Sequence, residues 1–140
     1  MDEYRDELLI GKIEFSNMIE EVCNGVLGLT NLGYCRIYVY SKEGKHIPHF
    51  HIISESSKFE CCVCIYSPNY FNHGNKNGSL NAKQRKILNN WLSSPNEKLN
   101  YATNWDIIAL SFDNANETNF YNKETKQQPN YSNMNSYKGG

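Results

Sequence analysis

Residues 46–53 read His46-Ile47-Pro48-His49-Phe50-His51-Ile52-Ile53, and this stretch decides the fold that we expect for the chain. Pro48 lacks a backbone donor and disfavours a helix at the residue before it, so the stretch is predicted to be an extended strand. Side chains alternate between the two faces of a strand. His49 and His51 therefore share one face, and Phe50 shares the other face with Ile52. One face suits a hydrophobic core, and the other carries imidazoles.

A second strand is predicted at residues 59–66, after a short polar link. So short a link favours an antiparallel hairpin. Because a slip of one residue would turn every core side chain to the wrong face, Phe50 must lie opposite Val63. The same register places both histidines opposite cysteines, His51 with Cys62 and His49 with Cys64.

The segments on either side of the hairpin also show recognisable patterns. Apolar residues recur at three- and four-residue steps over residues 4–26, which predicts one long amphipathic helix that can bend at Gly11. Residues 35–40 are rich in β-branched and aromatic residues and are predicted to be the first strand. Residues 67–78 are rich in Asn and Gly, so we expect a loop, or a short strand with a wide turn, that holds His73.

Two helix-capping patterns predict two further helices. Asn81 opens the first helix, which should end near residues 93–95, and Thr103 opens the second. Each capping residue has an amide or acidic residue three positions later, as in a capping box. Trp91 and Trp105 lie among the apolar residues of these helices, so we expect both rings to anchor the core.

The composition changes after residue 113. Residues 114–140 contain no Leu, Ile or Val, so we predict a disordered Asn-rich tail. For the rest we predict an α+β fold, in which a small antiparallel sheet of three or four strands packs against two or three helices. The expected single domain spans residues 1–113, with the N-terminal helix and its connection at 1–33 and the motif-bearing core at 34–112.

Length, charge and cysteine content limit the classes of function. The chain has 140 residues and a formal net charge of −1, so no overall field would attract nucleic acid or an anionic membrane. The acidic start differs from a signal peptide and no apolar run reaches transmembrane length, so we expect a cytoplasmic protein without membrane contact. The five cysteines are an odd number, and three of them crowd into residues 61–64. Reduced thiols are therefore a better interpretation than a disulfide framework.

The histidine-bearing face fits two kinds of chemistry. Tetrahedral zinc takes nitrogen and sulfur ligands, so a zinc site would use His49, His51, Cys62 and Cys64. Without a metal, the cysteines would act as small hydrophobic residues and the histidines would hydrogen-bond locally. A nuclease would use His49 and His51 as general acid and base, because imidazole titrates near neutral pH.

A third interpretation is a binding module that presents this face to a partner protein or nucleic acid. Aromatic and weakly charged faces suit such contacts. The candidate binding residues are Arg36, Tyr38, Tyr40, Lys45, His46 and Tyr66. The sequence contains no Gly-rich phosphate loop, nucleophile elbow or dinucleotide fingerprint.

Several of these features together resemble a small bacterial family, domain of unknown function 4160. They are a strand like residues 37–40, the motif Pro48-His49-Phe50-His51, a second strand, a helix ending in a Trp like residues 83–92, and the pair Asn104-Trp105. The resemblance implies a small accessory protein of toxin–antitoxin or mobile-element type, with a protein partner encoded nearby. We therefore expect a cytoplasmic bacterial protein that binds a partner through the histidine-bearing sheet face. A His-dependent nuclease and a zinc-binding module are the alternatives.

Overall fold

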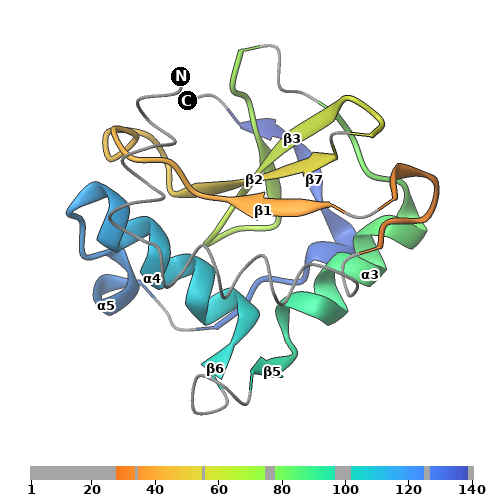
Figure 1. Ribbon diagram of the computed structural model, residues 1–140. Helices are drawn as coiled ribbons and strands as arrows, with labels where there is room; N and C mark the ends of the chain where they lie inside the picture. The colour runs from red at the N-terminus through yellow and green to blue at the C-terminus, as the bar shows by residue number, and fades with distance from the viewer. Residues whose placement is uncertain are drawn as a thin grey trace.

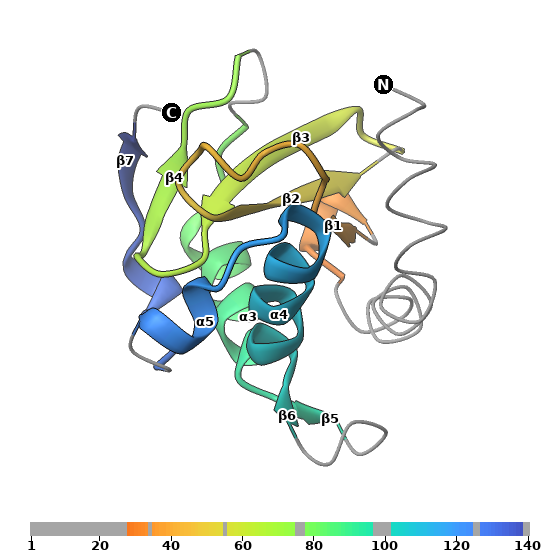
Figure 2. The same ribbon diagram turned by 90° about the vertical axis from the view of Figure 1, so that its left-hand side faces the viewer.

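A mixed sheet forms the centre of the molecule. The computed structural model describes residues 28–33, 35–54, 56–74, 78–96, 102–124 and 127–138, so the helix predicted for residues 4–26 lies outside the described residues. The antiparallel strands are β1 (Arg36–Tyr38), β2 (His49–Ser54), β3 (Phe59–Cys64) and β4 (Asn69–Phe71). The strand β7 (Asn135–Lys138) pairs in parallel with β4, which gives the order β1-β2-β3-β4-β7 (Figures 1 and 2).

The β2–β3 hairpin has the predicted register. Phe50 lies opposite Val63, and the two histidines of β2 lie opposite Cys62 and Cys64. β3 is shorter than predicted because it ends at Cys64 and the chain then bends through residues 65–68. The alternation of faces therefore does not extend to Tyr66.

Two helices cover one face of the sheet. They are α3 (Ala82–Leu92) and α4 (Asn104–Asn116), and both lie on the same side of the strands (Figure 2). Each begins with the capping box predicted from the sequence, at Asn81 and at Thr103. The short α5 (Phe120–Lys123) follows α4. Within the described residues, the predicted α+β fold is confirmed, with four antiparallel strands and three α-helices.

The main core lies between this sheet face and the helices. Its buried residues include Phe50, Ile52, Cys61, Val63, Leu88, Leu92, Trp105 and Ile108. Trp91 is also buried, so both tryptophans are core residues as predicted. Smaller elements complete the described chain, namely η1 (Thr30–Leu32), η3 (Tyr131–Asn133) and the strand pair β5 (Pro95–Asn96) and β6 (Ala102–Thr103). Among the described residues, no helix combines the length and the apolar character needed to cross a membrane.

The prediction of a disordered tail from residue 114 is wrong for the part of the tail that the structure describes. Tyr131 in η3 is fully buried, and its hydroxyl lies 2.7 Å from the carbonyl oxygen of Cys64 and 2.8 Å from that of Ile65. Its backbone N–H donates to Asn89 in α3. One buried ring and its hydrogen bonds therefore hold this segment against the core although its average hydrophobicity is low. Composition alone does not reveal such an anchor.

Candidate metal centre

Four side chains from three parts of the chain meet on the histidine-bearing face of the hairpin. Glu43 comes from the loop of residues 39–48 that joins β1 to β2, which we call the cover loop. His49 and His51 come from β2, and His73 follows β4. One ligand atom of each of the four lies within 4.8 Å of those of the others. Three imidazoles and one carboxylate thus surround one point.

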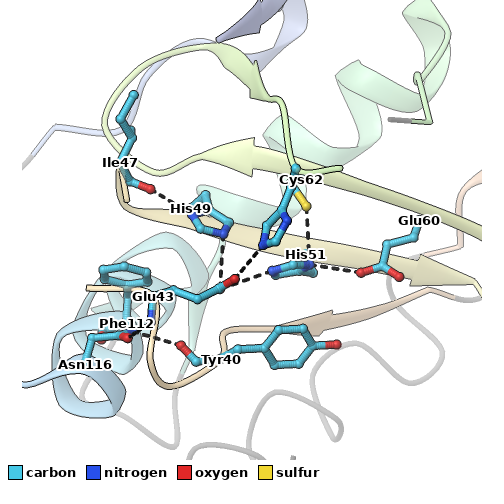
Figure 3. Close-up of polar contacts among 10 residues, drawn as sticks. Tyr40, Glu43, Ile47, His49, His51, Glu60, Cys62, Phe112 and Asn116 are labelled. Carbon is cyan, nitrogen blue, oxygen red and sulfur yellow. Dashed lines mark hydrogen bonds and ion pairs between the residues drawn. The ribbon is translucent and has the colours of Figure 1, made fainter. Parts of the chain in front are cut away.

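The carboxylate of Glu43 is the centre of this group. Its Oε1 lies 3.1 Å from Nε2 of His49 and 3.4 Å from Nε2 of His51, and Figure 3 shows it between these two rings. Its Oε2 lies 2.6 Å from Nε2 of His73. All three histidines therefore present the same ring nitrogen to one acid.

Burial differs among the four side chains. Those of His49 and His51 are 0 % exposed, that of Glu43 is 6 % exposed and that of His73 is 27 % exposed. The ring of Phe71 stacks on that of His49, with centroids 4.0 Å apart, and closes this end of the site. Solvent therefore reaches the group on the side of His73.

The outer nitrogens of the two strand histidines are held by acceptors. Nδ1 of His49 lies 2.7 Å from the carbonyl oxygen of Ile47, and Nδ1 of His51 lies 2.9 Å from Oε2 of Glu60 (Figure 3). A carbonyl or carboxylate oxygen can only accept, so each Nδ1 carries a proton. In a neutral ring the Nε2 lone pair then points into the site. Histidines that bind metals in proteins are usually held in this way.

Nε2 of His49 has no hydrogen-bond partner although it is completely buried. Burial lowers the pKa of His49, and its contacts with Glu43 offset this only in part, so the ring is neutral at pH 7. A bare nitrogen lone pair then faces a carboxylate oxygen at 3.1 Å. Two acceptors at this distance repel each other unless a cation lies between them.

Glu43 and His51 keep their charges although both are buried, because oppositely charged or polar groups surround each of them. Burial alone would raise the pKa of Glu43, but its close contacts with the imidazoles of His49, His51 and His73 hold that pKa well below its usual range. Burial alone would lower the pKa of His51, but contacts with Cys62, Glu43 and Glu60 raise it to about 10. In the absence of metal the His51 ring is therefore protonated at neutral pH. A bound ion would replace its Nε2 proton, because the Nδ1 proton is held by Glu60.

The end of α4 fixes the position of Glu43. The backbone N–H of Glu43 donates to Oδ1 of Asn116 at 2.7 Å, and Nδ2 of Asn116 donates to the carbonyl oxygen of Tyr40 at 2.9 Å. Gly44 passes close to the same helix end, where an added Cβ would lie 3.3 Å from the carbonyl oxygen of Asn116. The cover loop is thus held by the helix on one side and by the histidines on the other.

The two cysteines of the predicted zinc set do not join this group. Cys62 and Cys64 are on the same sheet face as the histidines and are buried, in contact with Phe71 rather than with Glu43. Sγ of Cys62 lies 3.3 Å from Nδ1 of His51, on the outer side of that ring. The structure therefore brings His49 and His51 together with Glu43 and His73 instead.

The candidate binding residues do not form one exposed surface. Tyr40 is buried with its ring centroid 4.4 Å from that of His51, and Tyr38 is half-buried beside it. His46 is half-buried between Phe71 and His73. The others are dispersed, with Arg36 exposed on β1, Lys45 exposed on the cover loop and Tyr66 packed against Trp105 on the helix side.

Two of the four converging residues, Glu43 and His73, are not among the site residues predicted from the sequence. The sequence pattern does not single out Glu43, and it places His73 only in a loop. The one signal for His73 was that it is the remaining histidine of the four in the chain. Glu43 had no local signal, because its position depends on Asn116, which is 73 positions away.

The comparisons with known proteins identify one family. The model of the family described as Domain of unknown function (DUF4160) matches residues 35–106, just over half of the chain. This span contains Glu43, His49, His51 and His73, whereas η3 and β7 lie beyond it. No curated protein and no solved structure matches the chain.

Proposed function

The chain belongs to the Domain of unknown function (DUF4160) family, and we propose that within the family's span it binds one divalent transition-metal ion through Glu43, His49, His51 and His73. The observation that carries this proposal is the buried Nε2 of His49, which faces the Glu43 carboxylate without a hydrogen-bond partner. A metal ion at this point would accept both lone pairs.

The ligand types limit the choice of ion. Three imidazole nitrogens and one carboxylate oxygen suit zinc and other first-row metals, whereas calcium and magnesium prefer oxygen ligands. Ligand atoms of a tetrahedral zinc ion lie about 3.3 Å from one another, given bonds of about 2.0–2.1 Å. The distances of 3.1 and 3.4 Å from Glu43 to His49 and His51 are close to that value. Oε2 of Glu43 lies 2.6 Å from Nε2 of His73 and the four ligand atoms spread over up to 4.8 Å, so Glu43 and His73 would have to shift for the four ligand atoms to surround one ion.

The ion would act as a crosslink. It would join the cover loop, the hairpin and the segment after β4, which meet on this face through Glu43 and the histidine rings. The expected nuclease would need substrate in contact with His49 and His51, and both are completely buried. Metal binding that stabilises the closed cover loop therefore fits this arrangement better than acid–base cleavage.

Partner binding is a separate proposal. Tyr40, His49 and His51 are buried, so a partner would meet the outer side of the cover loop instead of these rings. A partner encoded nearby, a toxin–antitoxin or mobile-element setting, a bacterial source and a cytoplasmic location stay predictions. Metal binding neither requires nor opposes them.

The test is the metal content of protein that carries no His tag. After purification in zinc-supplemented buffer and extensive dialysis, we expect about one zinc ion per chain by mass spectrometry, in line with a single four-ligand site. His49→Ala and Glu43→Gln should each lower the content to background. His46→Ala is the matched control. The ring centroids of His46 and His49 are 6.2 Å apart, but His46 is outside the converging group.

Two results would overturn the proposal. One is wild-type protein that holds only background zinc, manganese, iron, cobalt and nickel under saturating conditions. The other is stoichiometric metal that His46→Ala removes as completely as His49→Ala does. Circular dichroism of each metal-free variant would show that the fold is intact.

A further inference from the structure

We propose that Glu60 is the positioning residue that makes Nε2 the metal-binding nitrogen of His51. This inference rests on the proposed metal site but concerns a residue outside the four ligands. Glu60 is on β3, and its side chain is 23 % exposed. Its carboxylate therefore lies at the edge of the buried face, beyond the ring of His51 when viewed from Glu43.

Two side chains compete for Nδ1 of His51. Oε2 of Glu60 lies 2.9 Å from it and Sγ of Cys62 lies 3.3 Å from it (Figure 3). The two have opposite hydrogen-bonding abilities, because a carboxylate only accepts whereas a thiol can donate its proton. Whether Glu60 or Cys62 bonds to Nδ1 therefore decides which ring nitrogen of His51 carries the proton.

The two outcomes differ in which nitrogen is left for the metal. When Glu60 accepts from Nδ1, the Nδ1 proton is held outside the site and Nε2 is left to bind the ion. When Cys62 donates to Nδ1, the neutral ring carries its proton on Nε2, which then points at Oε1 of Glu43 at 3.4 Å. In the second arrangement the ring cannot coordinate an ion between itself and Glu43.

Physical chemistry favours the arrangement set by Glu60. A hydrogen bond to an ionised carboxylate is roughly twice as strong as one between neutral groups, and a thiol is a weak donor. His49 needs no such side chain, because the backbone carbonyl of Ile47 holds its Nδ1. The two strand histidines are therefore oriented by different acceptors, a backbone carbonyl for His49 and a side-chain carboxylate for His51. Only the acceptor of His51 can be removed by substituting a side chain.

The experiment measures zinc affinity by competition with a chromophoric chelator in untagged full-length protein. Glu60→Ala should weaken zinc binding about 10–100-fold, the range typical of lost outer partners of metal-bound histidines. Glu60→Gln keeps an acceptor oxygen and should lose less, which makes it the conservative rescue. Glu124→Gln is the matched control for loss of one negative charge, because Glu124 is exposed and is not among the contacts of the site.

Two further readouts separate positioning from a general structural effect. In the zinc-bound wild type, the His51 Nδ1 proton should give a slowly exchanging signal in nitrogen-edited proton NMR, and Glu60→Ala should abolish it. Adding Cys62→Ala to Glu60→Ala should recover part of the lost affinity, because it removes the competing donor. Circular dichroism of metal-free Glu60→Gln and Glu60→Ala would show that both variants are folded.

The outcomes distinguish this inference from the metal site itself. If wild-type protein binds zinc and Glu60→Ala binds it equally well, Glu60 does not position His51 although the metal site stands. The same conclusion follows if Glu124→Gln loses as much affinity as Glu60→Ala. If wild-type protein binds no metal, the proposed function fails and this inference fails with it.

Discussion

The two faces of the β2–β3 hairpin are equally buried but are buried in different ways. On the helix side, Phe50 and Ile52 are completely buried in an apolar cluster that includes residues of α3 and α4. On the loop side, His49 and His51 are just as completely covered, but the residue that meets them is the acidic Glu43. Side chains of one strand are therefore equally buried, but apolar contacts stabilise one face and contacts between ionisable groups stabilise the other.

The difference teaches what each face requires. An apolar face gains free energy from burial alone, at roughly 25 cal/mol for each Å² removed from water. A face of ionisable groups loses hydration on burial, at an effective cost of several kcal/mol per ion, and needs compensating charges. We therefore expect the stability of the helix side to be independent of metal, and that of the loop side to depend on it.

The largest effect on stability is expected on the helix side. Phe50→Ala should lower the free energy of unfolding by about 3–5 kcal/mol, because it leaves a cavity in the main core. The loss should be equal with zinc and with a chelator. Chemical denaturation of both forms measures it, and Ile47→Ala, at a side chain 43 % exposed, is the control. A loss that appears only in the chelated form would contradict the independence of the two faces.

Removal of metal should have the next largest effect. At a free zinc concentration 100 times the dissociation constant, binding to the folded state stabilises it by about 2.7 kcal/mol. Thermal unfolding with zinc and with a chelator measures this difference. In Glu43→Gln the difference should vanish, since the amide is a much poorer ligand than the carboxylate. Stabilisation by zinc of equal size in wild type and Glu43→Gln would place the ion elsewhere.

A smaller effect is expected at the anchor of the tail. Tyr131→Phe removes only the hydroxyl that bonds the carbonyl oxygens of Cys64 and Ile65, so the loss should be about 1 kcal/mol. It should be the same with and without zinc, because Tyr131 belongs to the helix-side core. Equilibrium denaturation in urea measures it. No change at all in both Tyr131→Phe and Tyr131→Ala would return the tail to the disorder expected from its composition.

The smallest effect is expected at the two cysteines of the loop side. A double variant, Cys62→Ser with Cys64→Ser, should hold as much zinc as the wild type, because neither thiol belongs to the converging group. Elemental analysis of the dialysed variant measures this. Loss of the metal would restore the site of two histidines and two cysteines predicted from the sequence.

The sequence predicted the features that repeat along the chain. The period of two in the hairpin gave its register, and the spacing of capping residues gave the starts of α3 and α4. Both signals are local, and both act through backbone geometry that a few neighbouring residues determine. The positions of Trp91 and Trp105 in the core follow from the same periodic patterns.

The features that the sequence did not predict depend on distant contacts. Glu43 enters the site because Asn116 holds its backbone, and Tyr131 enters the core because Cys64 and Ile65 accept from it. Neither segment has an apolar period, so nothing local marks it as buried. The sequence therefore identified the half of the site that lies on a strand, His49 and His51, and missed the half that lies in loops.

The location of the bound ion tests the central claim most directly. A crystal of the untagged protein grown with zinc, measured on both sides of the zinc absorption edge, would locate the metal by its anomalous scattering. We expect one strong peak about 2.0–2.2 Å from Nε2 of His49, His51 and His73 and from a Glu43 carboxylate oxygen. A peak at Cys62 and Cys64, or none between the hairpin and the cover loop, would contradict the proposed metal site.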